Sequence, residues 1–138
     1  MTLTIEQAQD MTRRRDAAMM AGDVESYMAL WADELVDEEP LIRFDRSELR
    51  AAIEAAFIGS RVRLMVTRSL GVAESAMFYE WTIVWEDRSS GERRPQTGMT
   101  YHEVDDSGRW CSCRVYWDAA DQPRRSALAE PEVADLLP

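Results

Sequence analysis

The hydrophobic pattern of the chain changes at Gly59, and this change limits the possible folds more than any other feature of the sequence. Before Gly59, apolar residues recur at intervals of three and four, as on one face of a helix; after it, apolar and polar residues alternate, as in a strand. The pattern predicts helices over 4–21, 24–31 and 47–58, an extended piece over 41–44, and strands over 61–70, 75–86, 93–104 and 109–117. Helices followed by strands that are joined by short turns indicate an α+β fold with an antiparallel meander.

Capping residues mark the ends of the predicted helices. Thr4 is followed three residues later by Gln7, which is the spacing of a capping box, and Ser47 is the expected cap of the third helix. The acidic run over 33–39 is expected at the far end of the second helix, where Pro40 closes the segment. Acidic runs of this kind usually face solvent.

The charge of the chain argues against two classes of partner. Its 138 residues include 26 acidic and 16 basic ones and carry a net charge of −10. Such a surface repels phosphate backbones and anionic headgroups, so neither a nucleic acid nor a membrane is expected as a partner. The chain does not begin like a signal peptide, and no segment approaches the ~18 apolar residues of a spanning helix. We therefore expect a cytoplasmic protein.

The soft metal ligands of the chain are few. Cys111 and Cys113 are two apart, and His102 is the single histidine. Three such residues without a repeated spacing do not resemble a zinc site. We expect no metal and no cofactor.

Four stretches of the sequence resemble a known superfamily: AGDVESYMALWADELVDEEP, IRFDRSELRAAIEAAF, VDDSGRW and CRVYWDAAD. They are similar to the SnoaL-like / nuclear-transport-factor-2-like (NTF2-like) proteins, which include ketosteroid isomerases and polyketide cyclases. The resemblance implies a cone-shaped, curved antiparallel sheet of the cystatin-like kind, wrapped around three N-terminal helices. It assigns residues 1–121 to this domain and 122–138 to a tail, which could carry a short helix from Pro131.

The same resemblance implies a cavity between the sheet and the helices. The strand positions expected to face it are Tyr79, Trp81, Ile83, Thr100, His102, Cys111, Cys113, Val115 and Trp117. From the other side, Arg15, Met19 and Glu39 are expected to border its mouth. A pocket of this composition suits a hydrophobic, cyclic or polyketide-like small molecule. The residues expected to bind it are Arg15, Met19, Tyr79, Trp81, Thr100 and Trp117.

The chemistries hosted by the superfamily differ in how well they fit these residues. Steroid isomerases keep a carboxylate base before the proline, where this chain has Glu39, but their oxyanion-binding places fall here on Arg15 and Thr100. Limonene-type epoxide hydrolases need an Asp–Arg–Asp group, and the matching places here are all apolar: Val115, Trp81 and Ile83. Polyketide cyclases need one acid/base residue, and Glu39 or His102 could serve.

We therefore predict a cofactor-free cyclase, isomerase or dehydratase in which Glu39 and His102 are the candidate catalytic residues. Pro40 favours an extended Glu39, which could aim its side chain inward, with His102 or Tyr79 as a hydrogen-bond partner. In the alternative arrangement, Asp37 or Glu38 faces the cavity and Glu39 faces water.

Two rival functions use the same fold. One is a non-catalytic binding or accessory domain, and the other is a dimeric module whose pocket is filled by its own side chains. The resemblance also implies a homodimer through the outer face of the sheet. The residues expected to point outward there are Phe78, Thr82, Val84, Tyr101 and Tyr116.

Overall fold

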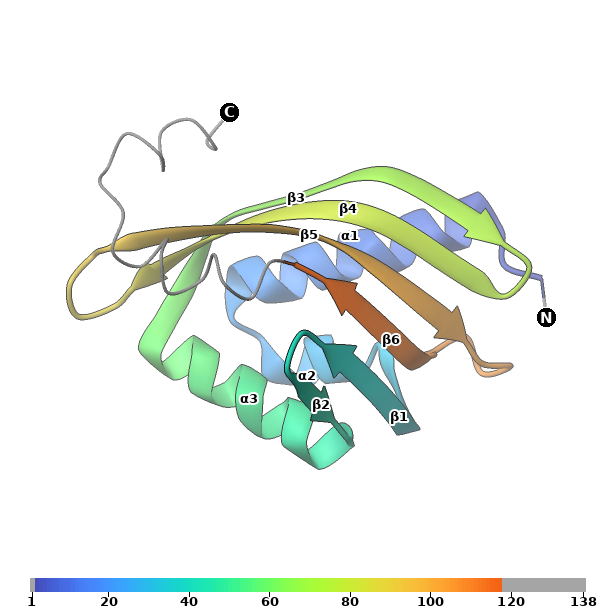
Figure 1. Cartoon of the computed structure of the whole chain (residues 1–138), viewed down its shortest axis with the longest axis horizontal. Coiled ribbons are helices and arrows are strands. Elements are labelled where there is room, and N and C mark those ends of the chain that lie inside the picture. Colours follow the sequence, from blue (N-terminus) through green and yellow to red (C-terminus); the bar gives the residue numbers. More distant parts are fainter. Residues whose placement is uncertain (1, 118–138) are drawn as a thin grey trace.

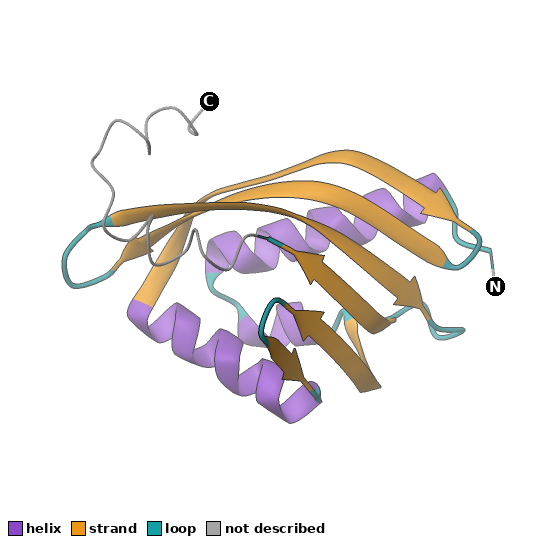
Figure 2. Ribbon diagram, in the orientation of Figure 1, coloured by secondary structure: helices purple, strands orange, loops and turns teal. Residues whose placement is uncertain are grey.

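The computed structural model describes residues 2–117, which form three helices and one six-stranded sheet (Figure 1). Along the chain these are α1 (Ile5–Ala21), α2 (Val24–Met28), β1 (Trp31–Glu39), β2 (Ile42–Phe44), α3 (Arg46–Gly59), β3 (Ser60–Ala73), β4 (Ala76–Asp87), β5 (Arg93–Val104) and β6 (Trp110–Tyr116). The strand order is β2-β1-β6-β5-β4-β3. Figure 2 shows the strands as one curved layer with the helices on its inner side. The predicted α+β fold class is confirmed.

The sheet is mixed rather than wholly antiparallel. Four neighbouring pairs are antiparallel, whereas β1 and β6 run parallel, with Asp37 opposite Cys113. A meander of consecutive strands is necessarily antiparallel, but β1 enters the sheet beside a strand that is distant in sequence. The strand alternation after Gly59 carried no information about this pair.

The second helix is shorter than predicted, and the acidic run belongs to a strand. The helix ends at Met28, and Trp31 begins β1. The backbone N–H of Trp110 donates to the carbonyl of Leu30 at 2.8 Å, and the Arg46 guanidinium donates to the carbonyls of Met28, Trp31 and Ala32. These distant partners satisfy backbone groups that a longer helix would have used internally.

The caps of α1 were predicted correctly, and the cap of α3 was not. Thr4 and Gln7 form the reciprocal capping box, and Gly22 ends α1 in the left-handed conformation at φ 64°. The cap of α3 is Asp45, two residues before Ser47, because its carboxylate accepts from the backbone N–H of Glu48.

Strand β6 contains a bulge that changes which of its residues face inward. In the pairing with β5, Val104 lies opposite Trp110 and Glu103 lies opposite Ser112, so Cys111 is an extra residue. Trp110 and Cys113 are consequently both buried, and the prediction that Cys111 faces the cavity is wrong.

The outer face of the sheet is apolar at one end only. Phe78, Tyr101 and Tyr116 are exposed, as predicted, but Thr82 and Val84 are buried. Val84 lies between Leu64 and Pro95 in the register, and side chains of neighbouring strands cover one another on the same face. Thr82 and Val84 therefore do not belong to an exposed patch.

The predicted end of the domain at residue 121, the tail over 122–138 and its short helix lie outside the described residues. Within the described part of the chain, no helix combines the length and the hydrophobicity that crossing a membrane requires. The cytoplasmic location stays a prediction.

Candidate functional site

A cavity of about 540 Å³ opens between the helices and the inner face of the sheet. All eight residues that the sequence nominated for binding or catalysis line it: Arg15, Met19, Glu39, Tyr79, Trp81, Thr100, His102 and Trp117. They come from α1, from the strands β1, β4 and β5, and from Trp117 directly after β6, and the curvature of the sheet brings them around one cavity. The volume of the cavity falls within the range of small-molecule sites.

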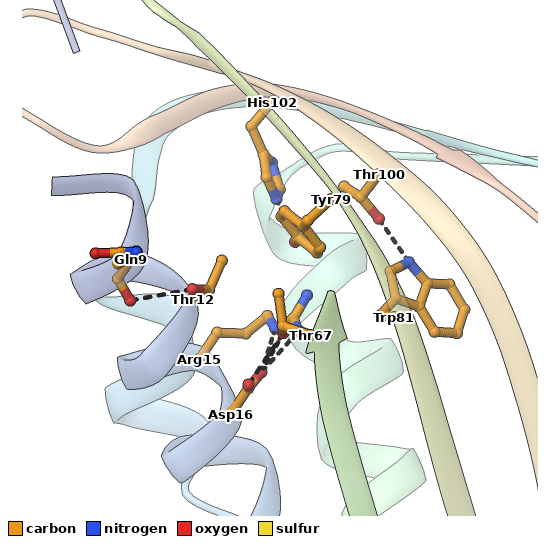
Figure 3. A network of polar contacts seen from close by, with 9 residues as sticks. All are labelled: Gln9, Thr12, Arg15, Asp16, Thr67, Tyr79, Trp81, Thr100 and His102. Carbon is orange, nitrogen blue, oxygen red and sulfur yellow. Dashed lines mark hydrogen bonds and ion pairs between the residues drawn. The ribbon is translucent and has the colours of Figure 1, made fainter. Parts of the chain in front are cut away.

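Arg15 extends from α1 toward β4 and is buried, although an arginine on a first helix is usually exposed. Its guanidinium carbon lies 4.5 Å from the centre of the Tyr79 ring, and Nη2 donates to Asp16 Oδ1 at 2.6 Å and to Thr67 Oγ1 at 2.7 Å (Figure 3). Burial alone would lower the pKa of Arg15, but Tyr79 and Asp16 raise it above its ordinary value. Arg15 is therefore a buried cation whose charge Asp16 balances.

The two polar pairs of β4 and β5 are already hydrogen-bonded within the protein. Tyr79 Oη lies 2.8 Å from His102 Nε2, and Trp81 Nε1 donates to Thr100 Oγ1 at 2.8 Å (Figure 3). The His102 ring also stacks on Trp110, with ring centres 3.9 Å apart. Burial, and then the charge of Arg15, lower the pKa of His102 well below its ordinary value. His102 is therefore neutral at physiological pH and cannot supply a proton as an imidazolium.

Two carboxyl groups of β1 face the cavity. Asp37 and Glu39 are two residues apart, which places them on the same face of the strand, and both line the cavity. Glu38 points outward and lies 3.8 Å from Arg114. Asp37 is 2% exposed, whereas Glu39 is half-buried and accepts from Trp117 Nε1 at 3.4 Å. The sequence left open which carboxyl group of residues 37–39 faces the cavity, and in the structure two of them do, Asp37 and Glu39.

The environment of Asp37 favours its protonated form. Burial and the neighbouring charge of Glu39 raise the pKa of Asp37 from 3.8 to about 8, and a contact with Cys113 opposes the rise. At pH 7 Asp37 is accordingly protonated. A carboxylic acid beside a carboxylate can donate and accept a proton at the same site.

Three further residues line the cavity: Asp37, Trp31 and Tyr27. From the sequence, Asp37 was predicted only as an alternative to Glu39, and neither Trp31 nor Tyr27 was predicted. The period-two spacing of Asp37 and Glu39 would have revealed the pair, but only if the acidic run had been interpreted as a strand. No group of three or more His, Cys, Asp or Glu side chains within residues 2–117 is arranged to hold a metal ion.

The sequence matches no protein-family profile and no curated protein. Its structure is similar to several solved ones. An epoxide hydrolase from Mycobacterium tuberculosis, described as LEH-like, shares 18% identity at a TM-score of 0.75, over 94% of this chain and 96% of that one. The Δ5-3-ketosteroid isomerase from Mycobacterium sp. shares 20% identity at a TM-score of 0.70, over 84% of this chain and 95% of that one.

A protein from Xanthomonas campestris, described as a proposed polyketide cyclase, shares 14% identity at a TM-score of 0.72, over 88% of this chain and 97% of that one. The chain has the SnoaL-like/NTF2-like fold. The predicted resemblance is thereby confirmed for the architecture. Because these identities are 20% or lower, the similarity establishes the fold and not the activity. The SnoaL-like/NTF2-like fold hosts unrelated chemistries.

Proposed function

We propose that this protein is a cofactor-free enzyme that binds a hydrophobic, cyclic or polyketide-like compound and moves a proton on it. Isomerisation, cyclisation and dehydration all belong to this class of reaction. The observation that supports the proposal is the carboxyl pair, since Asp37 and Glu39 face one largely apolar cavity together with Trp81 and His102. Apolar surroundings make a carboxylate a stronger base than it is in water.

Glu39 is the acid/base residue of the proposal. It is the more accessible of the two carboxyl groups, and Trp117 holds its Oε1 at 3.4 Å. Asp37 already holds a proton at pH 7, so we assign the accepting role to Glu39. His102 and Tyr79 act as a hydrogen-bonded unit that shapes the binding surface, and the neutral imidazole takes no proton from the substrate.

Deuterium exchange tests this proposal without knowledge of the natural substrate. A panel of hydrophobic cyclic ketones and 1,3-diketones is incubated with the protein in D₂O, and the loss of α-proton signals is followed by NMR. For a compound that exchanges, Glu39→Gln is expected to lower the rate roughly 10²-fold or more while binding persists, because acid–base assistance has this magnitude. Glu38→Gln is the matched control, since Glu38 is an exposed neighbour on the same strand.

Compounds that bind without exchanging, or an unchanged exchange rate in Glu39→Gln, would contradict the catalytic proposal. Such a result would favour the non-catalytic binding domain. If the protein binds no compound of the panel, the result would favour the second rival, the dimeric interaction module.

The homodimer is a separate prediction that depends on the outer face of β4, β5 and β6. Four large side chains are exposed there, from 36% to 59%: Phe78, Met99, Tyr101 and Tyr116. Clusters of this kind usually mark an interface. Sedimentation at micromolar concentration is expected to show a dimer, which Tyr116→Glu converts to a monomer. Ile58→Glu on α3, which is 79% exposed, is expected to remain dimeric. A wild type that sediments only as a monomer would refute the dimer.

A further inference from the structure

Three buried polar side-chain atoms on the cavity wall make no hydrogen bond in the described part of the chain: Nε1 of Trp31, Oδ1 of Asp37 and Nδ1 of His102. The imidazole stacks on Trp110 and interacts with the backbone of Ser112, so we base the inference on Trp31 and Asp37. Both residues are 2% exposed, and both line the cavity. A buried polar atom without a hydrogen bond costs about 1–3 kcal/mol. A pair of them on the wall of a cavity therefore indicates that a bound molecule completes their hydrogen bonds.

The two residues belong to the same region of the cavity. The Trp31 ring lies 5.5 Å from the His102 ring in an edge-on arrangement. In the register of the sheet, Asp37 pairs with Cys113, and Cys113 pairs with His102. Trp31 thus contacts the buried imidazole, and Asp37 lies two strands away from it in the register, across Cys113.

The other polar groups of the cavity are less available to a ligand. Arg15 is bound to Asp16 and Thr67, and Thr100 is bound to Trp81. Tyr79 is bound to His102. These pairs satisfy one another before any ligand enters. The unpaired atoms of Trp31 and Asp37 are consequently the positions at which a ligand gains most from a hydrogen bond.

We propose that Trp31 and Asp37 form a recognition site for a neutral carbonyl or enol oxygen of the ligand. This inference rests on the proposed function for the hydrophobic character of the ligand, but not for its turnover. An indole N–H can only donate, so it selects an acceptor atom and rejects an ammonium group. The neighbouring charge of Glu39 disfavours a carboxylate ligand.

The protonation of Asp37 allows its unpaired Oδ1 to donate to the same kind of oxygen, in competition with Glu39, which contacts the same carboxyl group. Burial and Glu39 raise the pKa of Asp37 to about 8, so its carboxyl group carries a proton at pH 7. A donor at such an oxygen stabilises the negative charge that develops there when a base removes a proton from the adjacent carbon. The groups that face Asp37 and influence this titration are Glu39 on the same strand, Cys113 on β6 and Tyr27 on α2.

A matched pair of probes tests the recognition site by binding alone. 2-Tetralone and tetralin have the same bicyclic shape, and only the first has a carbonyl oxygen. At pH 6.5 the wild type is expected to bind the ketone at least about 10-fold more tightly, which corresponds to one net hydrogen bond. Trp31→Phe is expected to reduce this preference to less than about 3-fold while its affinity for tetralin is kept. Trp85→Phe, at the part of the cavity near Phe57, should retain the full preference.

The contribution of Asp37 is tested by the pH dependence of the same preference. In the wild type the preference should decline above about pH 8, because the ionised carboxyl group no longer donates. In Asp37→Asn the side-chain amide still donates, so the preference should persist up to pH 9.5. The same decline in both proteins would overturn the role of Asp37.

A measurement on the wild type guards against a variant that fails to fold. With ¹⁵N-labelled tryptophan, the chain gives five indole N–H signals, and that of Trp31 is identified by elimination using variants of the other four. It is expected to move downfield with 2-tetralone and not with tetralin.

Equal affinity for the two probes, no binding of either at millimolar concentration, or a Trp31 signal that responds equally to both would overturn the recognition site. If only water occupies the site, neither probe shifts the Trp31 signal, and this outcome also overturns the recognition site. Ketone binding without deuterium exchange would instead refute the catalytic proposal alone.

Discussion

Replacement of Trp110 by alanine is expected to lower the free energy of unfolding by about 3–5 kcal/mol, the usual loss for a large aromatic residue in a core. Trp110 is fully buried at the start of β6. Its ring stacks on His102 at 3.9 Å and meets Trp31 edge-on at 5.4 Å, and Nε1 donates to the sulfur of Met77 at 3.3 Å. The substitution removes all three contacts and leaves a cavity that the surrounding sheet cannot close.

Urea denaturation at pH 6 measures this loss. Trp117→Ala is the matched control, because Trp117 is only half-buried and follows the end of the same strand. Its expected loss is below about 2 kcal/mol, since less apolar area returns to water. Equal losses of unfolding free energy in the two variants would show that Trp110 is not the main packing residue between β1, β5 and β6.

Relative to Asp37→Asn, the wild type is expected to lose stability between about pH 4 and pH 8. The pKa of Asp37 is raised from 3.8 to about 8 in the folded chain, so the folded state binds the proton more tightly than the unfolded state does. The stability due to this proton is complete below about pH 4 and is lost as the pH rises through about 8. Above pH 8 the folded chain holds a buried, ionised Asp37 beside Glu39.

At pH 9 Asp37→Asn is therefore expected to exceed the wild type in free energy of unfolding by on the order of 2–5 kcal/mol. His102 also contributes in this window, because the unfolded imidazole binds a proton near pH 6.5 that the buried one does not; this contribution raises the stability with pH and is common to both proteins. The carboxylates of Asp45, Glu86 and Asp87 have lowered pKa values, and burial lowers that of His102 and raises that of Cys113. Urea denaturation between pH 5 and pH 9 measures the difference, with Glu38→Gln as a control that should follow the wild type. Parallel curves for the wild type and Asp37→Asn would contradict the proposed protonation of the pair.

Much of the fold follows from short stretches of sequence. The capping box of Thr4 and the left-handed Gly22 delimit α1, and both operate within a few residues of the chain. The alternation over β3 to β6 likewise depends on neighbouring residues alone. Strand parity groups Tyr79 with Trp81 and Thr100 with His102, and the resemblance assigned these groups to the inner face, where the cavity has them.

The candidate site was predicted less completely than the fold. Arg15 was nominated through the resemblance, but its burial depends on Asp16 and Thr67, which neutralise and bind the guanidinium. Cys111 was assigned to the wrong face because a bulge interrupts the alternation without a signal in the sequence. Asp37 was one of three open choices in an acidic run whose secondary structure had been misjudged.

The sequence by itself determined α1, α3 and the strands after Gly59, because each depends on periodicity within a single segment, and the resemblance supplied the cavity and its facing residues. Only the tertiary structure decided that residues 31–39 are a strand and that Asp37 and Glu39 face inward together. The reason is that β1 pairs with β6, which is more than 70 residues away in the chain, and that its Trp31 and Ala32 carbonyls accept hydrogen bonds from Arg46 on α3. The protonation of Asp37 follows from the same contacts, since burial and the charge of Glu39 exist only after the sheet has formed.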